Sequence, residues 1–460
     1  MIKQINSKIS TDYKMTELGP LPQEWKVVKL GEVVKNIVSG DWGNSEKSNV
    51  DFIKCYVLRG TDFKKCEDKI INDVPVRFVL KNSFEKRKLK VGDILIELSG
   101  GGPGQPTGRI FFVTDDFIKK IGEYVIFSNF VKKLIADKNV ILPEYFYRYW
   151  QFLYQKGRTL VYEKRTTGIR NFKYNDFLKQ ENILIPKLQE QRKIAAILST
   201  VQKAIETEGK LIERTKELKK AMMHKLFTEG IGWLSGAETS QKQTEIGPIP
   251  ESWKVVKLGD YLLPNNDFRF SIDKDNFETA CFIPMSLIPE ENLFISKFEK
   301  RQVSGIRSGI VIYENDLLIA KITPCFENGK QGIVKGLVNG WGYATTEVIP
   351  IRTNEQINLI YIAYYFKYPK IRNYLASKME GSTGRQRLPK SQIENLKIPL
   401  PPLPDQQAIA DILSTIDQKI EFHSTKKQKL EELFRTFLHE LMTARVRVDE
   451  INLDFIKMEE

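Results

Sequence analysis

The stretch LQEQRKIAAILSTVQKAIETEGKLIERTKELKKAMMHKLF, residues 188–227, determines how this chain is organised. Its apolar residues recur at intervals of three and four, and charged or amide side chains fill most of the positions between them. That spacing predicts a long helix with one narrow apolar seam, which needs a second helix as its partner. At 1.5 Å per residue, about 40 helical residues extend roughly 60 Å.

The partner is predicted near the C-terminus, at residues 403–441, where the same spacing returns. Aligned without gaps, residues 188–201 and 403–416 are identical at eight of fourteen positions, and both contain Ile-Leu-Ser-Thr. Two ordinary bundle helices would give a similar pattern, but helices inside compact domains are usually far shorter. We therefore expect an antiparallel two-helix spacer, whose seam is formed by Ile194, Ile197, Val201, Leu211, Leu218 and Met222 and by Ile409, Ile412, Ile416, Leu430, Leu433, Phe437 and Leu441.

A second repeated signal lies before each helix. TELGPLPQEWKVVKLGE at residues 16–32 returns as TEIGPIPESWKVVKLGD at 244–260, with twelve of seventeen residues identical. This similarity indicates an internal duplication. The Gly-Pro-x-Pro element predicts an extended entry segment, and WKVVKL alternates like a short strand. We expect Trp25 and Trp253 to anchor these segments.

The duplication continues at lower identity. Residues 90–97 resemble 313–320, each a turn before a buried strand, and residues 145–168 align with 361–384. The latter segments are aromatic-rich, have a helical pattern and end in Thr-Gly, and a basic segment follows each. The offset between the repeats decreases from 228 to 215, so the second globular part is 13 residues shorter.

These patterns predict an α/β (α+β) protein, internally duplicated, with two globular domains separated by a long antiparallel two-helix coiled coil. Gly209 is a poor helix former, costing about 1 kcal/mol relative to alanine, so we expect local fraying or a kink there. The expected segments are a leader (1–15), a first domain (16–185), a first helix (186–229), a linker (230–243), a second domain (244–400), a second helix (401–445) and a tail (446–460).

The composition narrows the class of partner. Lysine and arginine outnumber aspartate and glutamate by 71 to 58, which gives a net charge of +13 and favours a polyanionic partner. No apolar run approaches the length of a membrane span, and the first residues lack the apolar core of a signal peptide. The four scattered cysteines are typical of reduced thiols in a cytoplasmic protein. Nucleic acid is therefore favoured over a membrane.

The sequence contains no convincing catalytic or metal site. The glycine-rich stretch at 100–108 lacks the order of a phosphate-binding loop, and no nucleophile elbow or amino-methyltransferase motif is found. The three histidines lie on the long helices, away from cysteine or a second histidine, so zinc is not expected. Glu217 and Lys219 have nuclease-like spacing, but on a charged helix face they are interpreted as solvated surface.

The candidate binding residues are basic and are expected in turns or loops, where a rigid scaffold can present them to base edges and phosphates. Each could also be an ordinary solvated charge, whereas the basic segment after Thr-Gly in both repeats favours DNA contact. The aromatic residues of the preceding helices are interpreted as core. The candidates are Lys86, Arg87, Lys88, Arg109, Lys164, Arg165, Arg170 and Lys173 in the first domain, and Arg301, Arg307, Lys321, Arg385, Arg387 and Lys390 in the second.

The doubled entry motif, the doubled Thr-Gly segments and the two helices opening QxxxIAxILST resemble the specificity subunit of type I restriction–modification systems. The resemblance covers nearly the whole chain outside the leader and tail. It implies two target-recognition domains, each reading one half of a split double-stranded DNA site, and paired helices that receive methyltransferase subunits, two in number. It also implies that the chain is not an enzyme: partner subunits supply adenine methylation with S-adenosylmethionine and ATP- and Mg-dependent cleavage.

The residue patterns themselves are compatible with this role, because two unlike basic domains on an antiparallel spacer can lie on two half-sites that face opposite ways. Three alternatives stay open at this stage. The chain could serve a related system whose partner fuses methylation and restriction, it could be a coiled-coil scaffold without a DNA role, or it could carry its own nuclease or methyltransferase activity.

Overall fold

The computed structural model describes residues 13–17, 19–47, 51–67, 71–100, 105–166, 169–236, 240–263, 277–382 and 384–448. The chain divides into two compact units. Unit 1 comprises Met1–Gly209 and Lys426–Glu460, and unit 2 comprises Lys210–Thr425. The expected leader and tail lie mainly outside the described residues, as do both members of the first Thr-Gly pair and the threonine of the second.

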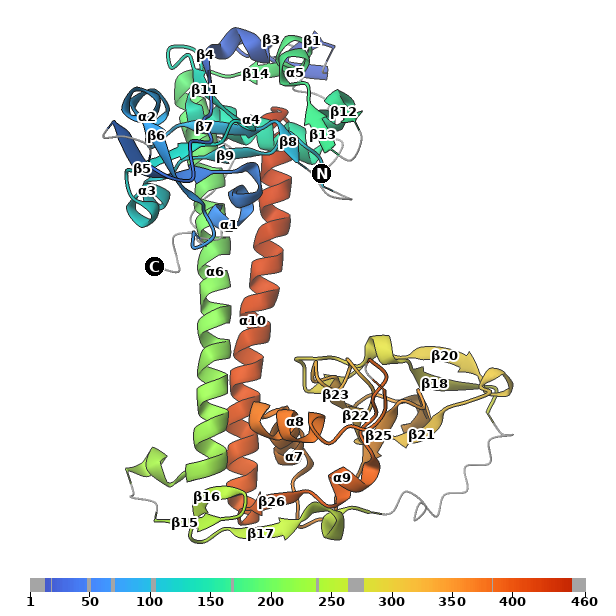
Figure 1. The fold of residues 1–460 in the computed structure, drawn as a ribbon. Coiled ribbons are helices and arrows are strands. Elements are labelled where there is room, and N and C mark those ends of the chain that lie inside the picture. The colour runs from blue at the N-terminus through green and yellow to red at the C-terminus, as the bar shows by residue number, and fades with distance from the viewer. Residues whose placement is uncertain are drawn as a thin grey trace. The chain divides into compact units, whose positions relative to one another are not determined.

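Unit 1 combines short strands and helices in several small sheets (Figure 1). Its strand orders are β1-β2, β10-β5-β6, β4-β11-β7-β9, β12-β13-β8 and β14-β3. The strands are β1 (Tyr13–Thr16), β2 (Gly19–Pro22), β3 (Lys26–Lys29), β4 (Val34–Ser39), β5 (Phe52–Leu58), β6 (Val76–Leu80), β7 (Ile94–Glu97), β8 (Ser99–Gly100), β9 (Ile110–Phe112), β10 (Val125–Phe127), β11 (Val131–Ala136), β12 (Glu163–Thr166), β13 (Ile169–Phe172) and β14 (Asn182–Ile185). The helices before the spacer are α1 (Phe63–Glu67), α2 (Lys81–Arg87), α3 (Asp115–Ile121), α4 (Pro143–Gln155) and α5 (Tyr174–Gln180).

Unit 2 repeats this plan with a smaller body. Its strand orders are β15-β16, β17-β26, β20-β18-β24-β21 and β19-β23-β22-β25. The strands are β15 (Gln241–Thr244), β16 (Gly247–Pro250), β17 (Lys254–Lys257), β18 (Thr279–Ile283), β19 (Phe294–Ile295), β20 (Glu299–Gln302), β21 (Ile310–Tyr313), β22 (Leu317–Ala320), β23 (Gln331–Val334), β24 (Trp341–Ala344), β25 (Val348–Ile351) and β26 (Lys397–Leu400). The shorter helices are α7 (Leu359–Lys367), α8 (Pro369–Ala376) and α9 (Lys390–Glu394).

Strands β7 and β22 form where the repeated segments 90–97 and 313–320 predict a turn followed by a buried strand. Every residue of both strands is buried, because each sheet is covered on both faces. Ile94 and Ile96 face the core that includes α4, whereas Leu95 between them faces a separate core on the other side of the sheet. Before each strand an aspartate, Asp93 or Asp316, accepts a backbone N–H three residues earlier and closes the turn.

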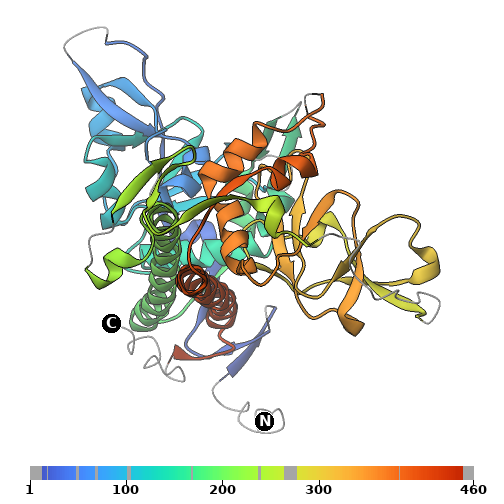
Figure 2. The same ribbon diagram turned by 90° about the horizontal axis from the view of Figure 1, so that it is seen from below.

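The two long helices are α6 (Leu188–Glu229) and α10 (Leu403–Met442), and each contributes one part to each unit. They lie side by side and run in opposite directions (Figures 1 and 2). Glu208 of α6 pairs with Lys426 of α10 at 3.2 Å within unit 1, whereas Lys219 pairs with Asp417 at 2.5 Å within unit 2. Helix α6 continues without a break through Gly209, so the expected local fraying does not occur.

Helix α6 buries a regular series of positions that alternate by four and three residues, as in a heptad repeat. Several members of the series are polar, which is why a search for apolar residues alone finds it only in part. The buried and half-buried members are Ile194, Leu198, Val201, Ile205, Glu208, Ile212, Thr215, Lys219, Met222 and Leu226.

Two residues expected in the seam are displaced from this series. Leu211 and Leu218 each precede a member by one residue, so Leu211 is only half-buried and Leu218 is 53% exposed. Leu218 therefore lies outside the seam, and this expectation is wrong. Ile197 is buried in the core of unit 1. On α10, Ile409 and Leu441 are buried, and the other expected members are half-buried, namely Ile412, Ile416, Leu430, Leu433 and Phe437.

The strand and helix content of both units and the paired long helices confirm the expected fold class. Some details near the segment boundaries differ from the sequence interpretation. Strand β1 begins at Tyr13, inside the expected leader, and β15 begins at Gln241, inside the expected linker. The start of the expected tail is packed against unit 1, because the Arg447 guanidinium donates to the carboxylates of Glu24 and Glu190.

Candidate nucleic-acid interface

Both units are built on the same hydrogen-bonded frame. In unit 1 the amide of Gln191, at the start of α6, accepts from the Leu142 N–H at 2.8 Å and donates to the carbonyls of Val140 and Pro186. The Tyr145 hydroxyl of α4 donates to the Leu184 carbonyl at 2.8 Å. These contacts fix α4, the exit strand β14 and the start of α6 as one body.

Unit 2 repeats each of these contacts at the matching positions. Gln406 accepts from the Asn358 N–H at 2.8 Å and donates to the carbonyls of Gln356 and Pro401. The Tyr361 hydroxyl donates to the Pro399 carbonyl at 2.9 Å. Tyr145 and Tyr361 are fully buried, in agreement with their interpretation as core rather than base-stacking groups.

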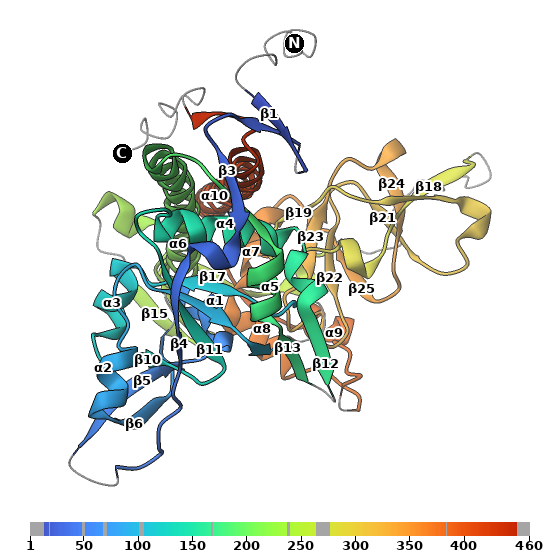
Figure 3. The same ribbon diagram turned by 90° about the horizontal axis from the view of Figure 1, so that it is seen from above.

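The basic segment of unit 1 forms a hairpin on this frame. Strands β12 and β13 form an antiparallel pair (Figure 3). In its register Arg165 stands opposite Arg170, and β13 also pairs with β8. Lys164 is exposed, and Lys173 is exposed at the base of the hairpin, where it precedes α5. The Arg170 guanidinium lies 3.8 Å from the Glu163 carboxylate. The structure therefore brings these four basic residues together.

Arg109 lies near this hairpin, but its guanidinium is hydrogen-bonded to the carboxylate of Glu97. Its Nε and Nη2 donate to the two oxygens of Glu97, at 2.8 and 2.5 Å. Glu97 is fully buried, and only 19% of the Arg109 side chain is exposed. The hydrogen bonds from Arg109 to Glu97 raise the pKa of the guanidinium further above its usual value. This pair neutralises a buried carboxylate, which is a structural role.

The run Lys86–Lys88 lies on and just after α2, in a different part of unit 1 that packs on β5, β6 and β10. Lys86 is exposed. Arg87 donates to the Ser39 carbonyl and to the Ser83 hydroxyl, both at 2.8 Å, and Lys88 pairs with Glu123 at 3.0 Å. The structure does not bring this run together with the hairpin.

In unit 2 the basic segment forms a closed loop. Glu380 and Arg387 exchange backbone hydrogen bonds at its base, and the Arg385 N–H donates to the Ser382 carbonyl near its tip. Arg385 and Arg387 are exposed. A cavity of about 580 Å³ adjoins the loop, and Lys321, Arg387 and Lys390 are among its lining residues.

Arg301 and Arg307 lie elsewhere in unit 2. Arg301 is on the exposed strand β20, where its guanidinium covers the Phe282 ring at 3.6 Å and donates to one oxygen of Glu299. Arg307 is exposed in the segment before β21. These two residues do not line the cavity formed beside Arg387.

The expectation that the basic candidates occupy turns or loops is wrong for half of them. They lie in regular elements because short strands and short helices replace the loops that the sequence pattern indicates. The corrected residues are Lys86, Arg87, Lys164, Arg165, Arg170, Arg301 and Lys390.

Sequence reasoning also missed the acidic partners Glu97, Glu163 and Glu347, because it searched for positive charge. Glu347 holds Arg387 in a two-oxygen ion pair, yet its sequence surroundings carry no signal of this role. Glu97 does have a recognisable signal, since it is a carboxylate that ends an otherwise apolar strand.

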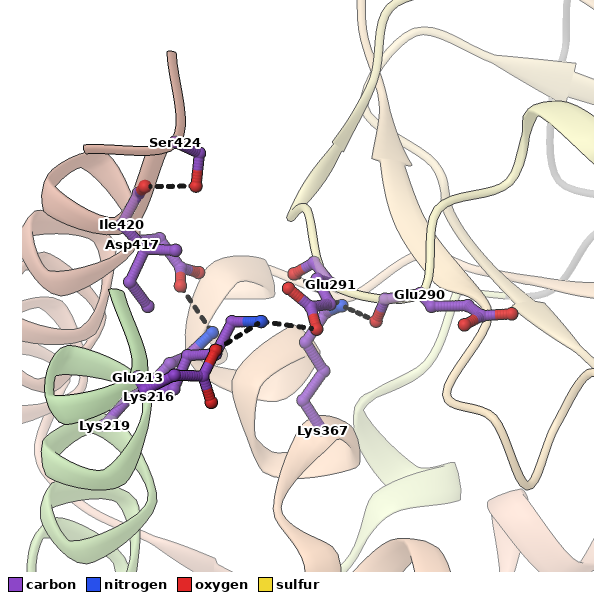
Figure 4. Close-up of polar contacts among 9 residues, drawn as sticks. All are labelled: Glu213, Lys216, Lys219, Glu290, Glu291, Lys367, Asp417, Ile420 and Ser424. Carbon is purple, nitrogen blue, oxygen red and sulfur yellow. Dashed lines mark hydrogen bonds and ion pairs between the residues drawn. The ribbon is translucent and has the colours of Figure 1, made fainter. Parts of the chain in front are cut away.

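The body of unit 2 is joined to the helices by a group of charged side chains (Figure 4). Lys367, at the end of α7, donates to the backbone carbonyls of Glu290 and Glu291 at 2.8 and 3.0 Å. Burial lowers the pKa of Lys367 to about 7. On α6, Lys216 pairs with the Glu291 carboxylate at 3.2 Å and Lys219 pairs with Asp417.

Three of the four cysteines, Cys55, Cys66 and Cys281, are buried, and two of the histidines contact aromatic side chains. All four cysteines are free, and burial raises the pKa of the Cys55 and Cys66 thiols to about 12, which keeps them protonated. His224 contacts the Tyr368 hydroxyl at 2.7 Å, and the His439 ring stacks on Phe152. Among the described residues, no cluster of three or more histidine, cysteine, aspartate or glutamate side chains could hold a metal ion.

None of the helices in the described part of the chain is long and apolar enough to cross a membrane.

Comparison with known proteins identifies the class to which this duplicated fold belongs. The family described as Type I restriction modification DNA specificity domain matches residues 22–217 and 250–432, which include most of both repeats. The chain belongs to this family. The resemblance noted in the sequence is thereby confirmed, and so is the expectation that the chain is a non-catalytic specificity component rather than an enzyme.

Individual relatives agree with this assignment. The chain is 28% identical over 450 residues to the type I restriction enzyme MjaVIII specificity subunit of Methanocaldococcus jannaschii, covering 94% of this chain and 95% of that protein. It is 33% identical over 218 residues to the EcoAI specificity subunit of Escherichia coli, covering 46% and 36% respectively. In fold it is similar to the S subunit of a type I restriction–modification system from M. genitalium, with 16% identity, a TM-score of 0.53 and coverage of 91% and 96%.

Proposed function

We propose that this chain directs a type I restriction–modification complex to one bipartite DNA sequence. Each unit reads one half-site, and helices α6 and α10 receive methyltransferase subunits, two in number, through which restriction subunits join the complex. The observation that carries the proposal is the repeat itself. Two units share one frame of buried hydrogen bonds, yet each presents a different set of basic side chains on it.

Charge supports double-stranded DNA as the ligand. The net charge of +13 favours a polyanion, and the exposed basic groups of the hairpin in unit 1 and the loop in unit 2 suit phosphates and base edges. In this proposal the partner subunits hold S-adenosylmethionine, ATP and Mg, and this chain holds no cofactor. The complex acts in the cytoplasm, where bacterial and archaeal DNA is found.

The test is methylome sequencing of a host that carries this chain together with its methyltransferase partner, compared with the same host lacking this chain. We expect one split adenine-methylation motif that disappears when the chain is absent. A methylation pattern independent of this chain would overturn the proposal. Band-shift assays give a second readout: the isolated chain should bind DNA weakly, and its complex with the methyltransferase should bind the motif tightly.

A further inference from the structure

Arg387 and Glu347 form an ion pair that leaves one hydrogen-bonding edge of the guanidinium available to a ligand. Nη2 of Arg387 donates to one oxygen of Glu347 at 2.9 Å, and Nε donates to the other at 3.1 Å. The Arg387 side chain is nevertheless 59% exposed, and that of Glu347 is 27% exposed. The hydrogen bonds that Arg387 donates to Glu347 raise the pKa of Arg387 further above its usual value, so the guanidinium stays charged.

A guanidinium has five N–H donors in a planar fork. When a carboxylate occupies the edge made by Nε and Nη2, the edge made by Nη1 and the second Nη2 hydrogen keeps two parallel donors. That edge fits two neighbouring acceptors, as O6 and N7 of guanine provide in the DNA major groove. Because both oxygens of Glu347 are engaged, the carboxylate also fixes the rotation of the guanidinium plane.

The backbone around the pair is itself restrained. The Lys321 N–H donates to the Glu347 carbonyl at 3.0 Å, and the Leu388 N–H donates to the Lys321 carbonyl at 2.7 Å. Arg387 is held by its two backbone hydrogen bonds to Glu380. Glu347 and Arg387 therefore lie on segments that are connected through Lys321, and Arg387 also lines the cavity of about 580 Å³ described above.

Arg158 of unit 1 makes a similar two-oxygen contact with Glu181 and is 52% exposed, but it lies outside the basic segments that follow Thr-Gly. Arg109 and Arg301 differ from Arg387 in the contact itself or in its exposure. Arg109 makes the same two-oxygen contact with Glu97, but that carboxylate is fully buried and the arginine is largely covered. Arg301 is exposed, but both of its donors reach the same oxygen of Glu299, a contact that fixes the guanidinium plane less firmly. Arg385 is exposed on the same loop as Arg387, and no ion pair to it is present in the described part of the chain.

We propose that Glu347 is a positioning residue for Arg387, and that the free edge of Arg387 donates to O6 and N7 of one guanine in the half-site read by unit 2. This inference rests on the proposed function and adds to it a specific base and the residue that orients the contact. An ordering carboxylate removes rotamer freedom before DNA binds, so less entropy is lost on recognition.

The test uses the complex of this chain with its methyltransferase partner. Binding is measured by competition on a panel of duplexes in which each base pair of the second half-site is replaced in turn. The variants are Arg387→Ala, Arg387→Lys, Glu347→Gln and the double variant Glu347→Gln/Arg387→Ala. Glu245→Gln is the matched control, because Glu245 is an exposed carboxylate of unit 2 paired with Lys397, away from the proposed contact.

We expect both Arg387 variants to lose discrimination at one G·C pair by about 10- to 100-fold, because a bidentate contact to guanine is lost. Glu347→Gln should lose part of the discrimination at that same pair, and it should add nothing once Arg387 is alanine. Glu245→Gln should leave the whole profile unchanged.

Two results would overturn the inference while leaving the proposed function intact. One is a Glu347→Gln profile equal to that of the unmodified complex. The other is that the Arg387 variants lose affinity equally for every duplex, which would identify a phosphate contact or a general loss of structure. A complex without any sequence preference before mutation would instead overturn the proposed function itself.

Discussion

The two units use identical frames to support different basic surfaces. Gln191 and Gln406 make the same three hydrogen bonds, and Tyr145 and Tyr361 make the same bond to the exit strand. The basic segments that follow are a hairpin paired to β8 in unit 1 and a closed loop beside a cavity in unit 2. Duplication has thus preserved what holds each unit together, whereas the groups available to a ligand have diverged.

The largest expected effect comes from exchanging most of one globular domain. Replacing residues 16–180 by the equivalent segment of a relative should change one half of the methylated sequence completely and leave the other half unaltered, because the frame contacts are shared. Methylome sequencing of the hybrid measures this directly. A change in both halves, or no change in either, would show that the two surfaces do not act independently.

Removing the frame glutamines should destabilise both units by similar amounts. Gln191→Ala and Gln406→Ala each leave one N–H and two carbonyls without their partner, which should lower the free energy of unfolding by about 2–4 kcal/mol. Urea unfolding of each variant provides the measurement. Gln418, exposed on α10, gives the control, since Gln418→Ala should change stability by less than about 0.5 kcal/mol. Clearly unequal costs at 191 and 406 would contradict the equivalence of the two frames.

The pair Lys219–Asp417 tests the polar part of the helix seam. Both side chains are largely buried, and Asp417 also accepts from the Tyr364 hydroxyl at 2.8 Å. Lys219→Leu should cost about 1–3 kcal/mol, because it leaves a partly buried carboxylate without its cation. The double variant Lys219→Leu/Asp417→Leu should recover most of that loss, and a double-mutant cycle in urea measures the coupling. Simple additivity of the two single costs would argue against an energetic role for the pair.

Lys367 should make stability depend on pH above neutrality. Its pKa is lowered to about 7 in the folded chain, so between pH 7 and about 10 the unfolded chain binds more protons than the folded one. Stability should therefore rise with pH across this window, as the cost of neutralising the buried amine decreases. Lys367→Met should reduce this rise, measured as the difference in unfolding free energy between pH 7 and pH 9. The exposed Lys378→Met serves as control, and an equal reduction in both variants would exclude Lys367 as the source.

The smallest expected effect lies at Gly209. A Cβ added there would have only Lys427 nearby, with its Nζ at 3.8 Å, and the helix is continuous through this position. Gly209→Ala should therefore raise the free energy of unfolding by about 0.5–1 kcal/mol. Urea unfolding at constant pH would reveal this shift, and a destabilised variant would indicate that α6 needs the glycine.

Sequence patterns alone were sufficient to predict the duplication, the two long helices and the family. These features depend on patterns that are local or repeated, such as the entry motif at 16–32 and 244–260 and the spacing of three and four in residues 188–227. Local patterns predict structure well because helix periodicity and turn chemistry are set by neighbours along the chain.

Which basic side chains are available to a ligand depends on long-range contacts in the folded chain. Arg109 and Arg387 look alike in the sequence, yet one neutralises the buried Glu97 and the other is held at the surface by Glu347, 40 residues away. Leu218 looks like a seam residue, but the helix partner places Lys219 in the seam instead. Partners distant in sequence fix burial and pairing, and a pattern read along one segment contains no information about them.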